Sequence, residues 1–132
     1  MKSFITIMIA ALALLVSSCK KEAGVGGDAE IKGTVWTYQL NGSLTDTVAD
    51  YAGADVYVYI VYGDNTGFDK RVKTDYNGDF RFSYLYPGDY TIYAYTFNPQ
   101  SVPGQEPVIR KITIESRDEV VEVERINIVA EP

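Results

Sequence analysis

The chain is 132 residues long and carries 12 basic and 18 acidic side chains, which give a formal net charge of −6 at pH 7. It contains no histidine and one cysteine, so Ser-His-Asp and Cys-His catalysis, histidine metal sites and intramolecular disulfides are excluded. An acidic chain without a basic stripe repels phosphate backbones, which argues against nucleic acid as a partner.

Residues 1–18 have the pattern of a signal peptide. Lys2 precedes an almost unbroken apolar run over residues 4–16. This run is shorter than the roughly 20 apolar residues of a membrane-spanning helix but fits the apolar region of a signal peptide. The small residues Ser17 and Ser18 then give a signal peptidase room to reach the backbone.

Cys19 extends this pattern, because Leu15-Val16-Ser17-Ser18-Cys19 resembles the lipobox of bacterial lipoproteins. The resemblance implies cleavage between Ser18 and Cys19 and lipidation of Cys19. Two or more acyl chains hold a domain durably on a membrane, so the implied location is the cell envelope, at the outer membrane, on a face that the pattern leaves open. The alternative, a cysteine inside the mature domain, lacks a second cysteine as partner.

The mature chain is predicted to be a lipidated tether followed by one domain. Residues 20–29 are small, polar and glycine-rich, which is typical of a flexible linker. With Cys19 they form the predicted tether, 19–29, and the domain covers residues 30–132. A domain of this size needs no disulfide, and we expect it to be monomeric, without metal or cofactor.

From Glu30 onward, β-branched and aromatic residues dominate short runs that are divided by Gly, Pro, Asn and Asp. This pattern is typical of strands and turns. It predicts an all-β fold, a seven-stranded antiparallel Greek-key β-sandwich. The seven runs are 30–38, 54–62, 68–75, 80–85, 90–97, 108–115 and 119–129.

Two turns and one bulge set the expected strand register. Asn77-Gly78 predicts a type I′ turn with positive φ at both residues. Tyr86-Pro87-Gly88-Asp89 predicts a type II turn, with Gly88 at positive φ. In the last run the apolar residues change phase, which predicts a bulge near Glu124-Arg125.

Four segments carry a family resemblance: 32–35, 53–58, 74–82 and 85–92. In this order they resemble the carboxypeptidase-regulatory-like and prealbumin-like (transthyretin-like) domains of secreted bacterial proteins. The resemblance implies a prealbumin-like or Ig-like sandwich but no particular function, because this scaffold hosts many roles. Some prealbumin-like proteins hydrolyse a purine breakdown product with histidines, which this chain lacks.

The remaining candidate chemistries have simple structural alternatives. Paired carboxylates support glycoside hydrolysis, but the acidic residues here lie mostly in turns or along the last run, as solvated surface groups would. Asp75-x-Asn77-x-Asp79 matches the start of an EF-hand loop, yet Phe80 stands where that loop needs glycine. Asp and Asn also stabilise tight turns, so we interpret these residues as turn residues.

Tyrosine is the one residue type in excess, with 11 copies. Tyr57 and Tyr59 share one strand face, and Tyr93 and Tyr95 share another. Such rings can stack on sugars or partner proteins, and they also pack against each other across strands. Both interpretations stay open at this point.

The two longest irregular segments, 39–53 and 98–107, are predicted at the end of the sandwich away from Glu30. An additional strand within 41–51 would reverse the direction of every later strand and remove this prediction. Long loops on a rigid scaffold often bind ligands, although both segments could equally be tolerated insertions. Together with the turn at 76–79, they supply the candidate ligand-binding residues Tyr51, Tyr76, Phe97 and Asn98.

These observations predict a membrane-anchored, non-enzymatic β-sandwich that acts as a binding or accessory module. Its partner would be a glycan or an envelope protein. The alternative is a structural or assembly component of the cell envelope or of a pilus. A small hydrolase is a weaker alternative, because it needs a cleft with two converging carboxylates.

Overall fold

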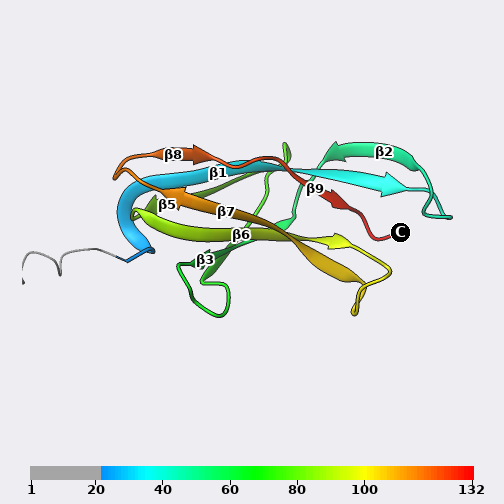
Figure 1. The fold of residues 1–132 in the computed structure, drawn as a ribbon. Coiled ribbons are helices and arrows are strands. Elements are labelled where there is room, and N and C mark those ends of the chain that lie inside the picture. Colours follow the sequence, from blue (N-terminus) through cyan, green and yellow to red (C-terminus); the bar gives the residue numbers. More distant parts are fainter. Residues whose placement is uncertain (1–21) are drawn as a thin grey trace, which may run out of the picture.

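The structure is a computed structural model that describes residues 22–132. The predicted signal peptide and Cys19 lie outside this described part. The described residues form two β-sheets packed face to face, which confirms the all-β sandwich (Figure 1). The strands are β1 (Val25–Leu40), β2 (Thr47–Ala52), β3 (Tyr57–Tyr62), β4 (Lys70–Lys73), β5 (Asp79–Leu85), β6 (Gly88–Phe97), β7 (Gln105–Ile114), β8 (Val120–Glu122) and β9 (Ile126–Val129). Within residues 22–132, no helix is long and apolar enough to cross a membrane.

One sheet has the order β4-β3-β6-β7 and is antiparallel throughout. The other is built around β1, which pairs with β5 and β8 along its first half and with β2 and β9 along its second half. Nine strands therefore replace the seven expected in the described part, and the arrangement is not purely antiparallel, because β8 and β9 run parallel to β1. The last run begins at the end of the sandwich where β1 begins, so it must follow β1 in direction.

Alternation of side chains builds the core between the two sheets. Every second residue of β1 from Ala29 to Thr37 is buried, and the intervening residues point outward. The largest fully buried side chains are Tyr90, Ile31, Ile60, Leu85, Ile92, Ile114, Ile126, Val35 and Val58.

The glycine-rich segment before Glu30 belongs largely to the domain, which corrects the predicted tether. β1 begins at Val25, and Ala29 is fully buried. At Gly27 a Cβ would lie 2.2 Å from the Leu85 carbonyl oxygen, so glycine here permits close backbone packing. The glycines that made this segment resemble a flexible linker therefore serve close packing of the backbone.

The predicted bulge in the last run is confirmed. Lys32 pairs with Glu122 and Val35 pairs with Ile126, so the last run contains one more residue than β1 between these two pairs. Val123 before the bulge is buried, as are Ile126 and Ile128 after it. The extra residue thus restores the inward face.

Neither predicted turn type is correct in detail. Gly78 has φ +78°, but Asn77 has no positive φ. Asp75 instead closes the turn, because its carboxylate accepts the N–H groups of Asn77 and Asp79. Gly88 has φ +151°, far from the value near +80° that a type II turn requires, and it begins β6 directly.

Candidate functional site

The end of the sandwich opposite Glu30 carries both predicted loops. An additional strand, β2, does form within the first of these segments. It does not reverse the direction of the later strands, because β2 and β3 run in the same direction, so the predicted reversal is wrong. β2 is antiparallel to β1, and β3 is antiparallel to β6, which returns along the sandwich after β5. Residues 41–46 and 98–104 therefore lie at one end (Figure 1).

Two of the four predicted ligand-binding residues meet at this end. Tyr51 and Phe97 line a pocket of about 670 Å³ whose wall also includes Thr37, Pro103 and Ile128. We call it the end pocket. Tyr95, Gln105 and Glu131 also line this pocket, so its wall combines aromatic, apolar and polar side chains.

The other two predicted residues do not join the end pocket. Tyr76 is 94% exposed in a turn that lies against Val35, part way along β1. Asn98 stabilises its own loop. Its side-chain oxygen accepts the backbone N–H of Gln100 at 2.9 Å, and its backbone N–H donates to the Gly104 carbonyl.

A larger aromatic surface lies on the outer face of the sheet β4-β3-β6-β7. Tyr59 of β3 and Tyr93 of β6 are register partners, and their rings stack with centroids 5.0 Å apart and planes within 9°. Tyr95 lies edge-on to both rings, at 5.6 and 5.7 Å. Tyr57 adjoins Tyr59 at 6.3 Å.

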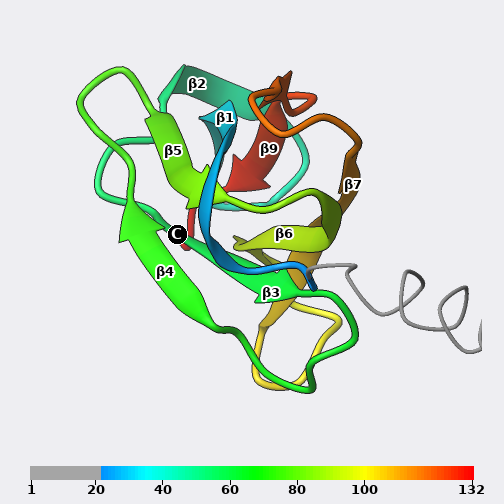
Figure 2. The ribbon, with the colours of Figure 1, turned by 90° about the vertical axis from the view of Figure 1, so that its left-hand side faces the viewer.

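Phe68 completes this surface and was not found by sequence reasoning. It precedes β4 and packs edge-on against Tyr59, with centroids 4.9 Å apart. We call Tyr57, Tyr59, Phe68, Tyr93 and Tyr95 together the tyrosine face. In Figure 2 the strands β3, β4 and β6 of its sheet lie below β2, β5 and β9, which belong to the other sheet.

Two cations of β4 lie over the rim of the tyrosine face. The Arg71 guanidinium is 4.2 Å from the centre of the Tyr57 ring, and the Lys73 ammonium is 5.0 Å from it. Such contacts stabilise the arrangement modestly at exposed sites. Arg71 and Lys73 were also missed from the sequence, because only the β3–β4 pairing brings them beside Tyr57.

The Tyr93 hydroxyl of the tyrosine face stays protonated at physiological pH. Burial raises the pKa of the Tyr93 hydroxyl, and the neighbouring Tyr95 and Tyr59 raise it further. A phenol with an ordinary pKa near 10 is already neutral at pH 7, so its hydroxyl can both donate and accept hydrogen bonds.

The opposite outer face, on the sheet of β1, carries a polar aromatic network with a structural explanation. The Trp36 indole N–H donates to Asp50 at 2.9 Å. Arg125 donates to Asn127 and to the Tyr38 hydroxyl, and its guanidinium lies 5.4 Å from the Trp36 ring centre. These contacts tie β2 and β9 to β1, so the polar groups already satisfy one another.

The acidic residues of the Asp75–Asp79 segment serve the fold. Asp75 accepts two backbone N–H groups of its own turn, and Asp79 accepts the Thr34 hydroxyl at 2.7 Å. Among the residues that the structure describes, no three His, Cys, Asp or Glu side chains gather as a metal site would require.

The fold and these surfaces define an all-β sandwich with one exposed aromatic sheet face and one end pocket. No protein-family model matches the sequence, and no curated protein is significantly similar to it. Among solved structures, the chain resembles a candidate carbohydrate binding protein from Pseudomonas aeruginosa, with a TM-score of 0.48 and 15% identity over 86% of this chain and 94% of that one. It also resembles (S)-allantoin synthase, with a TM-score of 0.44 and 10% identity, over 78% of this chain but only 42% of that enzyme. Likeness at this level concerns the fold alone.

Proposed function

We propose that this protein is a lipid-anchored, non-enzymatic β-sandwich of the bacterial cell envelope that binds a glycan on its tyrosine face. The anchor is Cys19, exposed by cleavage after Ser18, and the domain is of the prealbumin-like type; these parts rest on the sequence patterns. The observation that carries the binding function is the tyrosine face itself.

Packing explains only part of the tyrosine face. Tyr59 and Tyr93 stack on each other and are half-buried. In contrast, Tyr57 and Tyr95 are each 39% exposed, and Phe68 is 49% exposed. Contiguous exposed apolar surface of this kind usually marks an interaction site in a soluble domain.

The chemistry of the tyrosine face suits a sugar chain. A pyranose ring has apolar C–H faces, which pack on aromatic rings, and a rim of hydroxyl groups, which exchange hydrogen bonds with phenols. Tyrosine offers both a large apolar ring and a hydroxyl at a small cost in conformational entropy. Because the four tyrosine rings stand on hydrogen-bonded strands, they are held in place before any ligand arrives, which lowers the entropic cost of binding.

The non-enzymatic part of the proposal is supported by the carboxylates of the groove between β4 and β5. Asp75, Asp79 and Glu122 line this groove. Asp75 and Asp79 accept hydrogen bonds from the turn or from Thr34, so these two carboxylates are engaged in the fold.

The alternative function is a structural or pilus-assembly role. The pairing of the strands argues against one version of this role, in which another protein donates a strand to complete the domain. A domain completed by a donated strand would lack a strand when isolated. In the described part of the chain all nine strands have a partner, and β1 is paired along both edges.

Affinity electrophoresis of the purified chain tests the proposal, with gels that contain xylan, mixed-linkage β-glucan, polygalacturonate or hyaluronan. We expect at least one of these to retard the protein, and Tyr95→Ala to weaken that binding by about tenfold or more, as loss of a central aromatic contact does. Tyr76→Ala is the matched control, since Tyr76 is fully exposed but lies off the tyrosine face.

Three results would contradict the proposal. One is the absence of retardation in every gel, and another is a loss of binding on Tyr51→Ala but not on Tyr57→Ala, which would place the site in the end pocket, because Tyr57 does not line that pocket. The third is a stable dimer in sedimentation experiments that Tyr95→Ala dissociates, since a second copy would then cover the tyrosine face.

A further inference from the structure

Resting on the proposed function, we infer that the glycan bound on the tyrosine face is an acidic polysaccharide, recognised through its carboxylates by Arg71 and Lys73. The inference comes from the charges that surround the rings.

The outer face of this sheet departs from the charge balance of the chain. The chain as a whole has 12 basic and 18 acidic side chains. The register places four charged residues at outward positions of β3, β4, β6 and β7, and three of them are basic: Arg71, Lys73, Lys111 and Asp89. The acidic exception is already engaged, because Asp89 accepts the Thr113 hydroxyl at 2.8 Å.

Arg71 and Lys73 are free to meet an anion. Within residues 22–132 neither side chain makes an ion pair or a hydrogen bond, and both cationic groups lie over the Tyr57 ring. An arginine that lies on an aromatic ring keeps its planar N–H groups at the edge, where they can bind a carboxylate with two parallel hydrogen bonds.

The spacing of the two cations suits a linear ligand. Arg71 and Lys73 are two residues apart on one strand, so their side chains leave the same face about 7 Å from each other. Both cationic groups lie over the Tyr57 ring, so a sugar chain that packs on the tyrosine face beside Tyr57 would bring its carboxylates within reach of both cations.

Electrostatics makes the cations decisive for an acidic ligand. The net charge of −6 repels anions, so an acidic polysaccharide needs a local positive group to approach the rings. That attraction acts over about one Debye length, roughly 10 Å at 0.1 M salt, and should therefore weaken as salt is added.

The test compares polysaccharides that differ only in charge: polygalacturonate and hyaluronan, each beside its methyl ester, in affinity electrophoresis of the full chain. We expect the acid form to bind about tenfold or more tightly than the ester at low salt, and the difference to shrink as NaCl rises from about 0.05 to about 0.5 M. The double variant Arg71→Gln/Lys73→Gln should lower the preference for the acid form over the ester to about threefold or less.

Two further variants separate charge from other effects. Lys32→Gln/Arg117→Gln removes the same charge away from the tyrosine face, since Lys32 belongs to β1 and Arg117 follows β7, and it should keep the full preference. Arg71→Lys keeps the charge without the planar N–H groups, and it should keep part of the preference.

The outcomes distinguish this inference from the proposed function. Equal binding of acid and ester, or binding of neutral glycans only, with Tyr95→Ala abolishing it, would overturn the acidic ligand and leave glycan binding intact. An equal loss of preference in both double variants would also overturn it, because the effect would then follow net charge. Absence of binding to every glycan would overturn the proposed function as well.

Discussion

Gly78 holds the turn between β4 and β5 in a conformation that suits glycine. Its φ is +78°, and a Cβ at this position would lie 2.3 Å from the Val35 carbonyl oxygen. We expect Gly78→Val to lower the free energy of unfolding by more than about 1 kcal/mol in denaturant titrations. Gly67→Val is the control, because a Cβ added at Gly67 would meet no other atom within 4 Å and the φ of Gly67 lies outside the left-handed region. An unchanged stability of Gly78→Val would mean that the turn has another geometry.

Tyr90 joins the start of the domain to the turn before β6. Its hydroxyl donates to the Tyr86 carbonyl at 2.6 Å and accepts the Gly24 N–H at 2.9 Å, as the hydroxyl of a tyrosine corner bonds to upstream backbone in other β-sandwiches. Tyr90→Phe should therefore lower the free energy of unfolding by about 1–2 kcal/mol.

The same hydroxyl gives a pH dependence with a definite sign. Burial raises the pKa of Tyr90 above its ordinary value. The folded state then holds its proton more tightly than the unfolded chain, so the contribution of Tyr90 to stability is complete below about pH 10 and is lost as pH rises further. Unfolding titrations at alkaline pH should show a smaller decline for Tyr90→Phe than for the unmodified chain, and identical declines would rule this origin out.

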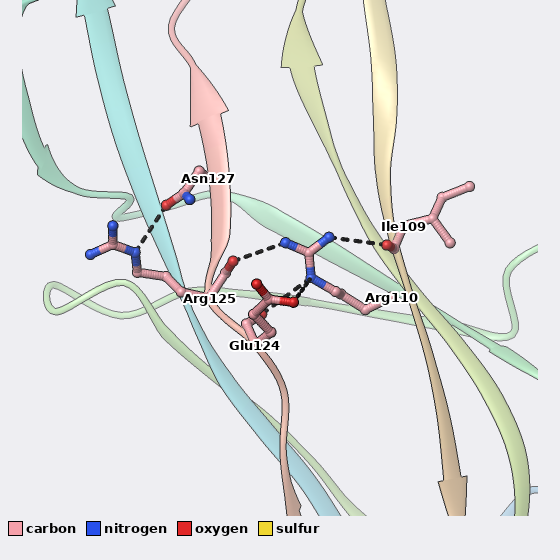
Figure 3. Close-up of polar contacts among 5 residues, drawn as sticks. All are labelled: Ile109, Arg110, Glu124, Arg125 and Asn127. Carbon is pink, nitrogen blue, oxygen red and sulfur yellow. Dashed lines mark hydrogen bonds and ion pairs between the residues drawn. The ribbon is translucent and has the colours of Figure 1, made fainter.

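Arg110 of β7 forms hydrogen bonds with the backbone of the bulge that separates β8 from β9 (Figure 3). Its guanidinium donates to the backbone carbonyls of Arg125 at 3.0 Å and of Glu124 at 3.4 Å. The carboxylate of Glu124 lies 4.0 Å away and is 86% exposed. The backbone contacts, and not the ion pair, should therefore stabilise the bulge.

This reasoning gives a paired prediction for the unfolding free energy. Arg110→Met should lower it by about 1–2 kcal/mol, because two carbonyl groups lose a charged donor. Glu124→Gln should leave it within about 0.5 kcal/mol of the original value. Equal effects of the two substitutions, measured by denaturant titration, would contradict this assignment.

The strands that the sequence could predict are those that bury one face. β5 and β6 alternate between buried and exposed residues, and the bulge before Ile126 showed itself as a change in that phase. β2 has no such signature, because nearly all its side chains are exposed and it pairs with β1 alone. The type of the turn at Gly78 was not predicted for a different reason. Hydrogen bonds to the Asp75 side chain determine the geometry of this turn, and residue propensities do not predict such bonds.

The candidate site was predictable to the same limited degree. Strand alternation identified Tyr57, Tyr59, Tyr93 and Tyr95, and the β3–β6 register brings them together. The sequence did not reveal Phe68 or the cations beside Tyr57, because a loop and an edge strand supply them. Which tyrosines would stack and which would stay exposed depends on that register and on ring orientation.

The proposed lipid anchor would determine where the whole molecule acts, and the lipobox-like segment at residues 15–19 makes a direct prediction. Cys19→Ala should abolish incorporation of a labelled fatty acid and leave the precursor uncleaved by the lipoprotein signal peptidase. Both can be followed on one gel by label and by mobility. Persistent labelling of the variant would contradict the assignment of Cys19 as the lipidated residue.

The central claim is that the tyrosine face binds a glycan, and an NMR titration of backbone amides tests it most directly. The titrant is a short fragment of whichever polysaccharide retards the protein. The account predicts that shifts concentrate on β3, β4 and β6 around Tyr57, Tyr59 and Tyr95. Shifts confined to the end pocket around Tyr51 and Phe97, or to the opposite face around Trp36, would contradict it.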